Sequence, residues 1–502
     1  MSTDPGTPYG IKTRLMVGME IHVELNTRSK MWTSAPNVAH PDYVDAEPNT
    51  LLDGVVMGMP GTLPVMNKAA LEKSVLVGLA LNCAIAPRAK WDRKAYWYPD
   101  LPKSYQISQY DRPICGEGWM EIPTEAGPKK IRLERAHLEE DAGKLMHDSP
   151  GGGAIAHSIV DLNRAGTPLL EIVTKPDFAT AAEAVTFSKM LRDLCRHLGV
   201  TEGVMQQGHM RFEPNINVII EKDGVVYKTP IVEVKNLNSF RAVEGAILHE
   251  HQRQVEQWVK DGKVMGSRSK STRGWDDVKM ATIPQREKED ADEYRYFPDP
   301  DLVEVEVGEA WLAEIRAQLT EAPHLKKARW VAAGLDEKDA ESLLEEPGVT
   351  RFFESVVKAG AQAQAAAKFL RNTAAKLANT EGRAIDRLGA TPAQVGGILS
   401  LLAENKVGSG NAEKLLAACC AAPGVDAAEV ADKAGFIQVS DSGAIEALVD
   451  QILGDPANAK AVADLRAGNM KAVGALMGQA KKLSGGKADA KAVQEMIAKR
   501  IG

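Results

Sequence analysis

Two segments of the chain carry acids, amides, a histidine and an arginine at every second position. These residues are Glu20, His22 and Glu24 within Val17–Leu25, and Arg211, Glu213, Asn215 and Asn217 within Met210–Val218. Because successive residues of a β-strand point to opposite faces, each segment would form a strand with one apolar and one polar face. Carboxylate oxygens suit Mg²⁺, and a planar guanidinium suits phosphoryl oxygens. The pattern therefore predicts a magnesium and phosphate site, and with it ATP chemistry, in a chain without a Walker loop.

The densest group of acids lies within Arg135–Lys144. Taken alone, this group fits the solvated surface of a helix equally well. Mg²⁺ is usually held by few carboxylates together with substrate phosphates and water, and Glu20, Glu140 and Glu213 could supply those carboxylates from three separate segments. His22 is predicted as a further ligand or as a group behind the ligands, because a nitrogen donor is unusual for this hard cation.

Two arginines are candidates for contacts with a phosphoryl group: Arg211, and Arg295 among the aromatic residues of Tyr294–Pro298. An ordinary salt bridge is the alternative for either arginine. Further polar positions complete the candidate set. They are Lys94, Glu233 and Lys235 as catalytic residues, and Lys144, Asn215 and Asn238 as nucleotide-binding residues.

No segment offers a nucleophile that could release ammonia from an amide. The chain has no Gly-x-Ser-x-Gly elbow, and none of its cysteines lies in a glutaminase-like context. If the protein uses amide nitrogen, we expect another protein to release it.

The composition changes near residue 303. Before this point, short alternating segments rich in Pro, Gly and aromatic residues predict an α+β domain with a large antiparallel sheet, interrupted by helices at 181–198 and 239–261. After it, Ala-, Leu-, Glu- and Lys-rich sequence predicts helices throughout. Breaks divide this half into a helical domain, 304–425, and a terminal domain, 426–502. A further break at Gly454-Asp455-Pro456 is expected to be a linker.

Charge and cysteine usage narrow the class of protein. Residues 456–502 carry nine lysines and arginines against three acids, although the whole chain has a net charge of −7. This basic tail predicts contact with nucleic-acid phosphates, and a solvated lysine-rich surface explains the charge equally well. Five scattered cysteines without a Cys-x-x-Cys pair predict a reduced, cytoplasmic protein. We expect no membrane span and no signal peptide, since neither apolar pattern is present.

Several long motifs resemble, in the same order, those of the B subunit of aspartyl/glutamyl-tRNA amidotransferase, the GatB family. The longest is the signature Val160–Val173 (VDLNRAGTPLLEIV). The others are Gly18–Glu24, Asp92–Gln109, Glu139–Lys144, Lys235–Phe240 and Tyr294–Pro298, and Gly474–Gln479 and Gly485–Ala488 are similar to the YqeY-like tail of that subunit. The likeness covers nearly the full length.

The resemblance implies a fold and a function. Residues 1–303 would have a glutamine-synthetase or guanido-kinase type of fold, bind ATP and Mg²⁺, and phosphorylate the side-chain carboxylate of misacylated Glu-tRNA(Gln) or Asp-tRNA(Asn). A glutaminase A subunit would then supply ammonia through a channel, a small C subunit would clasp the pair, and the helical and tail domains would hold the tRNA. The family's metal ligands match Glu20, His22, Glu140 and Glu213, and Lys94 matches a lysine on the ammonia route.

The chain departs from the family pattern at two places. Glu213 stands where most relatives have an aspartate, which is one methylene shorter and changes the coordination distance or the number of waters. Some relatives carry cysteines for zinc after the first motif, whereas Lys30–Pro36 contains none. The sequence therefore predicts no zinc.

Two other classes of function remain open. One is a non-catalytic tRNA-binding scaffold with a degenerate kinase-like domain, and the other is a free-standing small-molecule ligase that resembles glutamine synthetase. The acids and the arginine at Glu20, Glu140, Arg211 and Glu213 argue against a mere scaffold. The basic helical tail argues against a small-molecule ligase.

Overall fold

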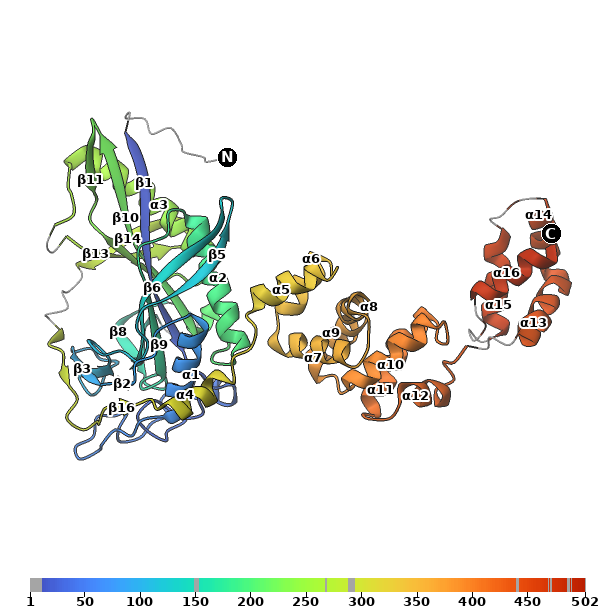
Figure 1. The fold of residues 1–502 in the computed structure, drawn as a ribbon, viewed down its shortest axis with the longest axis horizontal. Coiled ribbons are helices and arrows are strands. Elements are labelled where there is room, and N and C mark those ends of the chain that lie inside the picture. Colours follow the sequence, from blue (N-terminus) through green and yellow to red (C-terminus); the bar gives the residue numbers. More distant parts are fainter. Residues whose placement is uncertain are drawn as a thin grey trace. The chain divides into compact units, whose positions relative to one another are not determined.

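The chain forms two compact units, Met1–Pro323 and His324–Gly502. A computed structural model describes residues 11–148, 153–266, 269–287, 294–438, 442–467, 469, 472–484, 488 and 490–501. Figure 1 shows strands and helices together in the first unit, whereas the described part of the second is helical. Within the described residues, no helix is long and apolar enough to cross a bilayer.

One sheet of nine strands forms the centre of the first unit. Its order is β14-β13-β12-β10-β1-β9-β6-β5, and β11 pairs with β10 beside this path. All of these pairs are antiparallel except β12 with β13. The strands are β1 (Lys12–Glu24), β5 (Gly118–Thr124), β6 (Gly127–Glu140), β9 (Pro168–Thr174), β10 (Met210–Lys222), β11 (Val225–Lys228), β12 (Val232–Lys235), β13 (Ser271–Asp276) and β14 (Ala281–Glu287). The antiparallel-dominated sheet that the sequence predicts is confirmed.

Alternation along the two central strands gives the sheet an apolar and a polar face. The register of β1 and β10 sets Glu20 opposite Glu213 and His22 opposite Arg211, so the polar residues of both strands share one face. The residues between them are fully or almost fully buried: Met19, Ile21 and Val23 of β1, and Phe212 and Ile216 of β10. A shift of one residue in this register would move the acids into the apolar core, so the hydrophobic pattern fixes the pairing.

Three helices pack against the apolar face (Figure 1): α1 (Lys68–Ala80), α2 (Ala181–His197) and α3 (Phe240–Asp261). The side chains of Thr180 and Ser239 cap the N-termini of α2 and α3, and Gly262, with a φ of 65°, ends α3. The helices expected at 181–198 and 239–261 are therefore confirmed. Because β12 and β13 are parallel, α3 serves as the crossover between them.

Short elements surround the main sheet. Their bounds are β2 (Arg88–Ala89), β3 (Asp92–Ala95), β4 (Tyr105–Ser108), β7 (Lys144–Asp148), β8 (Ala154–Asp161), β15 (Phe297–Pro298), β16 (Val305–Glu306), α4 (Glu309–Arg316), and the 3₁₀ turns η1 (Pro41–Tyr43) and η2 (Met205–Gln207). β15, β3 and β4 form one small sheet, and β16–β2 and β7–β8 form two others. Helix α4 belongs to the first unit, where Trp311 donates a hydrogen bond to Glu72 of α1 (2.9 Å).

A buried lysine anchors the turn in the signature segment. Lys30 has no exposed surface, and its Nζ donates to the carbonyls of Asn163 (2.8 Å) and Ala165 (2.6 Å). Gly166 follows with a φ of 83°, and its N–H donates to the carbonyl of Asp141 (2.9 Å). The turn is therefore held from both sides, and it fixes the backbone that ends β6.

The second unit is built from short helices. They are α5 (Pro323–Ala332), α6 (Glu337–Leu344), α7 (Pro347–Lys358), α8 (Ala363–Phe369), a π-helical turn η4 (Leu370–Ala374), α9 (Ala375–Glu381), η5 (Ile385–Arg387), α10 (Pro392–Ala403), η6 (Ser409–Asn411), α11 (Ala412–Ala421), α12 (Ala427–Lys433), α13 (Ser442–Gly454), η7 (Pro456–Asn458), α14 (Ala459–Arg466), α15 (Val473–Leu483) and α16 (Ala490–Ile501). One apolar cluster spans residues 330–431, and a second spans 445–497. The helical half predicted from the sequence is confirmed.

The break at Gly454-Asp455-Pro456 is a turn inside an apolar cluster, so the expectation of a linker there is wrong. Ile452 of α13 shares that cluster with Leu476 and Ile497 of the following helices. Asn458 donates back across the turn to the carbonyl of Ile452 (3.0 Å). The boundaries expected at 303 and 425 stay a prediction, and Lys471, Lys487 and Asp489 of the basic tail lie outside the described residues.

Leu81 and Cys83 lie so close to Gly118, at the start of β5, that a side chain at this position would collide with them. A Cβ there would lie 2.7 Å from the carbonyl oxygen of Leu81 and 2.9 Å from Cα of Cys83, whereas a Cβ at Gly18 of β1 would meet nothing closer than 3.6 Å. Gly118→Ala should therefore lower the free energy of unfolding by roughly 1–3 kcal/mol. Gly18→Ala, the matched control in the same sheet, should cost less than about 0.5 kcal/mol. Urea unfolding, followed by a signal from the first unit, measures the free energy of unfolding of both variants. Equal losses of free energy would contradict the packing described.

Candidate active site

The polar face of the sheet gathers ionisable side chains from five neighbouring strands. Strand pairing sets His137, Glu171, His22 and Arg211 in one row across β6, β9, β1 and β10. A second row contains Glu20 and Glu213, and a third contains Asn215 and Glu233. Since these residues share a face, carboxylates that are far apart in the chain lie next to one another. The register of the paired strands therefore determines which side chains form the site.

One group of three carboxylates lies over β1, β10 and β12. The carboxylate oxygens of Glu20, Glu213 and Glu233 fall within 4.8 Å of one another. Asn215 Nδ2 donates to Glu20 Oε1 (2.9 Å), and Lys235 Nζ contacts Glu213 Oε2 and lies 3.4 Å from Glu233 Oε1. Burial disfavours the charged ammonium, but Glu213 and Glu233 outweigh it and raise the pKa of Lys235. Lys235 therefore stays charged and offsets part of the acidic cluster.

A second group lies beside the first, over β1, β6 and β9. It consists of His22, Glu139 and Glu171, whose ligand atoms also fall within 4.8 Å of one another. His22 Nε2 lies 3.4 Å from Glu171 Oε2, and His137 Nε2 lies 3.6 Å from the same oxygen. Burial opposes a charge on His22, but the neighbouring carboxylates of Glu171 and Glu213 raise its pKa. His22 thus offsets part of the negative charge of this partly buried group.

Glu140 lies apart from both groups. It follows Glu139 in β6, and alternation turns its side chain to the other side of the strand. There its Oε1 contacts Lys103 Nζ and accepts the N–H of Ile107 (3.0 Å). Of the four metal ligands expected from the sequence, the structure brings Glu20 and Glu213 together and places His22 in the adjacent group. Glu139 offers the oxygen that Glu140 was expected to provide, and the ligand roles stay predictions.

Arg211 closes the site with a network of charged groups at the end of β10. Its Nη2 donates to Asp141 Oδ2 (2.8 Å), and its Nη1 lies 3.3 Å from Glu24 Oε1. Arg164 of the signature turn lies 3.7 Å from the same Asp141 oxygen and donates to the carbonyl of Gly143 (2.6 Å). Burial and the charge of Asp141 raise the pKa of Glu24. Against its own burial, Asp141 keeps a lowered pKa because both arginines are close.

Lys94 approaches the second carboxylate group from the small sheet. Its Nζ lies 5.2 Å from the ring centre of Tyr294 and 5.9 Å from that of Tyr96. Burial lowers the pKa of this ammonium, but Glu139 together with Tyr296, Glu171 and Tyr96 outweighs that effect, and the pKa is raised overall. The lysine is therefore charged, with an aromatic face on two sides and carboxylates nearby.

Three predicted residues lie at exposed positions. Arg295 has a φ of 47°, a left-handed backbone that sits between Tyr294 and Tyr296. Lys144 begins β7, and Asn238 lies in the loop between β12 and α3. All three are exposed, so their proposed contacts with a nucleotide stay predictions.

Three site residues are not among those predicted from the sequence: Asp141 in the arginine network, and Glu139 and Glu171 in the second acidic group. Glu24 belongs to the alternating pattern of the first segment, and Glu139 lies inside a segment selected for its acids. Strand alternation offers a signal that could have chosen Glu139 over Glu140, given the pairing of β6 with β9. Glu171 sits alone among the apolar residues of β9, and a single acid in such a strand is the remaining clue.

Both acidic groups fit a hard divalent cation by their donor chemistry. Carboxylates that stand side by side out of water require a positive charge between them. Among the described residues, His22 Nδ1 is buried without a hydrogen-bond partner, at 3.9 Å from Glu213 Oε1. This nitrogen faces Glu213 of the first group, although the ring itself belongs to the second group. The donor chemistry therefore agrees with a magnesium site, which stays a prediction.

Removal of Arg211 should destabilise the fold in a pH-dependent way. Arg211→Met should lower the free energy of unfolding by roughly 3 kcal/mol at neutral pH, because it removes the cation that hydrogen-bonds to Asp141 and leaves only Arg164 beside the buried Asp141 and Glu24. The lowered pKa of Asp141 gives a stabilisation that is present above its ordinary value of 3.8 and is lost as the pH falls through the folded-state pKa. The difference between wild type and variant should thus shrink below about pH 4.

The matched control is Arg112→Met, because Arg112 pairs with Glu304 at the surface. Exposed ion pairs contribute at most about 1 kcal/mol. Thermal unfolding at several pH values compares the two variants. A loss at Arg211 no larger than that at Arg112, or a gap that widens in acid, would contradict the buried network.

The chain matches two protein-family models and is similar to proteins of known name. The family model described as "GatB/GatE catalytic domain" matches residues 15–313, and the model described as "GatB domain" matches residues 351–501. The chain is similar to several bacterial proteins that are named as the B subunit of aspartyl/glutamyl-tRNA(Asn/Gln) amidotransferase. It is 41% identical to the one from Rhodopirellula baltica over 93% of both chains, and 39% identical to the one from Trichormus variabilis over 97% of both. The one from Burkholderia ambifaria is 40% identical, over 97% of this chain and 99% of the relative. The resemblance read from the motifs is confirmed, and the chain belongs to the GatB family.

Proposed function

We propose that this chain is the subunit of a tRNA-dependent amidotransferase that activates and amidates the side-chain carboxylate of Glu-tRNA(Gln) or Asp-tRNA(Asn). The observation that carries this proposal is the pair of acidic groups, buried beside Arg211, Lys235 and Lys94 on one sheet face. Family membership supplies the class of reaction, which is a glutamine-dependent carbon–nitrogen ligation.

The chemistry of the reaction matches such a site. A carboxylate does not react with ammonia at neutral pH, so one of its oxygens must first become a leaving group, and phosphorylation by ATP achieves this. Mg²⁺, when bound, would neutralise charge on the phosphates. Glu20, Glu213 and Glu233 would hold it, with Asn215 and Lys235 orienting their oxygens.

The cations around the acids would contact the phosphoryl group and control the entry of ammonia. Arg211 and Arg295 would contact phosphoryl oxygens, and Lys144 and Asn238 would contact the nucleotide. Lys94 lies between the tyrosine rings and Glu139, so it would repel a second ammonium ion and favour entry of neutral ammonia. A buried site also slows hydrolysis of the acyl phosphate, because it excludes water.

The proposal includes partners, location and fold. Since the sequence shows no nucleophile for glutamine hydrolysis, a glutaminase A subunit would supply ammonia and a small C subunit would hold the two together. The enzyme would work in the cytoplasm, in keeping with five cysteines that are all free. We also infer that the first unit has the glutamine-synthetase or guanido-kinase type of fold and needs no zinc.

Loss of one carboxylate from the first group should stop ATP turnover. In the assembled complex, with ammonium chloride replacing glutamine, Glu213→Gln should reduce tRNA-dependent ATP hydrolysis at least about 100-fold, because the metal loses an anionic ligand. The ammonium salt removes any dependence on the glutaminase. Glu221→Gln at the half-exposed end of the same strand is the matched control and should keep full activity. Activity of a folded Glu213→Gln variant near the wild-type level would favour the scaffold alternative.

The same assay separates the two neighbouring acids of β6. Glu139 lies in the second acidic group, whereas Glu140 holds Lys103 and the backbone of Ile107. If both groups act on the metal and ammonia, Glu139→Gln should raise the magnesium concentration required for half-maximal activity. A shift of this requirement with Glu140→Gln instead would restore the ligand set implied by the family resemblance.

We propose that the terminal helices contact tRNA phosphates. Lys481 and Lys482 end α15, and Lys499 and Arg500 end α16. Both helices therefore carry basic side chains at their C-termini, where the helix dipole stabilises positive charge. Because α13 shares the apolar cluster of α15 and α16, a clean truncation removes residues 439–502.

Deletion of 439–502 should weaken tRNA binding and flatten its salt dependence. Each lost phosphate contact removes roughly one unit from the slope of log affinity against log salt. Neutralising the four cations with glutamine, in the intact chain, isolates charge from the loss of surface. Amidation should change mainly through the KM for tRNA, with kcat retained. An unchanged slope in both variants would assign the tail charge to a solvated surface.

A further inference from the structure

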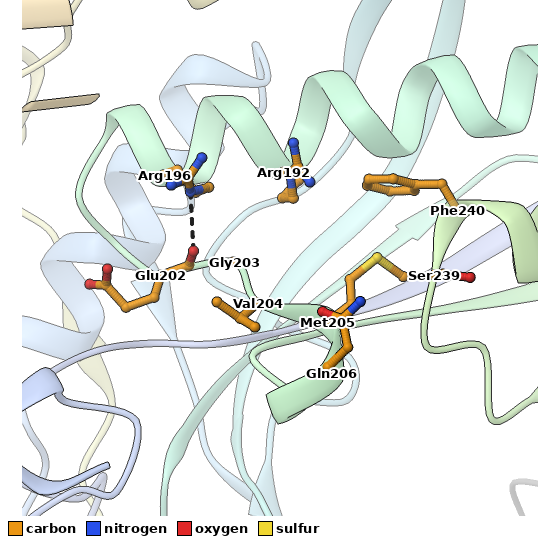
Figure 2. A pocket seen from close by; sticks show the side chains of 9 residues that line it. All are labelled: Arg192, Arg196, Glu202, Gly203, Val204, Met205, Gln206, Ser239 and Phe240. Atoms are coloured by element: carbon orange, nitrogen blue, oxygen red, sulfur yellow. Dashed lines mark hydrogen bonds between the residues drawn. The ribbon is translucent and has the colours of Figure 1, made fainter. Parts of the chain in front are cut away.

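A cavity of about 250 Å³ lies at the junction of α2, η2 and the start of α3. Figure 2 shows Arg192 and Arg196 on one side of it, Phe240 at one end, and Val204, Met205 and Gln206 below. Its volume is just under the usual range for ligand pockets, so it suits one small group and not an extended chain. None of its residues belongs to the acidic groups described above.

Two cations of α2, Arg192 and Arg196, line this cavity, and Lys189 lies on the same face of the helix before them. Lys189, Arg192 and Arg196 are spaced by three and four residues, which places them in a stripe along the helix. The Arg192 guanidinium lies 5.1 Å from the ring centre of Phe240, and Lys189 Nζ lies 5.9 Å from it. Asp193 offsets part of this charge through Arg192 (2.8 Å). Glu202 also lines the cavity, so these three cations and two acids leave an excess of one positive charge.

The loop after α2 holds the two arginines in place. Gly203 has a φ of 68°, and a Cβ there would lie 2.8 Å from Cγ of Arg196 and 3.1 Å from Cγ of Arg192. The glycine therefore lets the loop pack against both arginine stems. Arg196 Nε donates to the carbonyl of Glu202 (3.1 Å), while the Glu202 carboxylate accepts from Asn26 (3.0 Å). Figure 2 shows that this carboxylate points away from Arg192 and Phe240.

The opposite wall is apolar and is formed by Val204 and Met205. Phe240, at the end of the cavity beside Arg192, packs against Phe212 of β10 (5.7 Å between ring centres). A cationic rim over an aromatic and apolar floor is the arrangement by which proteins hold single-stranded nucleic acid: the cations contact phosphate and the floor contacts the base. The chemistry of the cavity thus matches a nucleotide.

The wall of the cavity is continuous with the acidic site. The loop that carries Val204 and Gln206 continues to Gly208, where a Cβ would lie 3.7 Å from Glu24 Oε1 and 4.0 Å from Arg164 Nη1. On the other side, Ser239 follows Lys235 by four residues, a distance of at most roughly 14 Å. Two segments of the chain, 203–208 and 235–239, therefore connect the wall of the cavity to the residues of the site.

We infer that this cavity binds one nucleotide of the single-stranded 3′ end of the tRNA, with its phosphate on Arg192 and Arg196 and its base against Val204, Met205 and Phe240. This inference rests on the proposed function, since it assigns a place to the RNA that carries the amino acid. The next nucleotides pass the loop at 206–208 and bring the aminoacyl group to the metal side of the sheet.

Arg192→Gln/Arg196→Gln in the assembled complex tests the phosphate contact. The KM for the aminoacyl-tRNA should rise about tenfold, with kcat and the KM for ATP retained. The slope of log affinity against log salt should fall by about 0.7 for each lost contact with a single strand. Lys130→Gln/Arg132→Gln on β6 is the control, because it removes the same charge from exposed positions and should change neither quantity.

Phe240→Leu tests the base contact separately. It keeps an apolar side chain but loses the stacking face, so the KM for the tRNA should rise severalfold while the salt slope stays at the wild-type value. A charge-preserving Arg192→Lys/Arg196→Lys variant should recover most of the slope. Together these variants distinguish phosphate binding from a general loss of structure.

Three outcomes would overturn the inference. An unchanged KM for tRNA in the double variant would show that the cavity does not contact it. A raised KM for ATP alone would assign the cavity to the free nucleotide, and a failure to assemble with the other subunits would assign it to an acidic protein segment. If the proposed function itself fails, the wild-type complex lacks tRNA-dependent ATP hydrolysis, which is a separate readout.

Discussion

The first unit depends on keeping many acidic side chains close together on a sheet that is otherwise apolar. Mutual repulsion and loss of water both oppose this arrangement, so each acid is matched to a nearby cation or amide. Lys235, His22, His137, Lys94 and Arg211 supply the compensation at the two acidic groups and in the arginine network. The register of β1 with β10 sets the first acidic group, and the pairing of β9 with β1 and β6 sets the second.

Support for this face comes from segments outside the central strands. The signature turn holds Asp141 through backbone hydrogen bonds at Gly166 and Thr167, and it brings Arg164 to the same carboxylate. Lys30 fixes the turn from within, since its ammonium is bound by carbonyls of the turn and not by a carboxylate. The signature segment Val160–Val173 therefore holds the acidic side chains in position. Gly166 allows its turn, and Arg164 contacts Asp141.

Local pattern was enough to predict the sheet, its helices α2 and α3, and the polar faces of β1 and β10, because alternation and helical period are properties of short segments. It also selected Glu20, Glu213, Asn215 and Arg211, which the structure places on one face of the sheet, while their roles stay predictions. Pairing is not local, however. Glu171 gains its role only when β9 lies between β1 and β6, and the choice between Glu139 and Glu140 depends on which face β6 turns to β9. The Gly454–Pro456 turn was misjudged because its apolar partners lie on later helices.

The crossover formed by β12, α3 and β13 has an evolutionary consequence. Parallel pairing sends the chain through a helix that starts at one end of the sheet, so the loop from Asn236 to Ser239 leaves the core immediately after Lys235. Loops at strand ends accept new residues without disturbing the strands. Changes of length or charge in the loops 236–239 and 203–208 would therefore alter which ligands the protein binds. The acids on the sheet would keep their positions, so the reaction itself would stay the same.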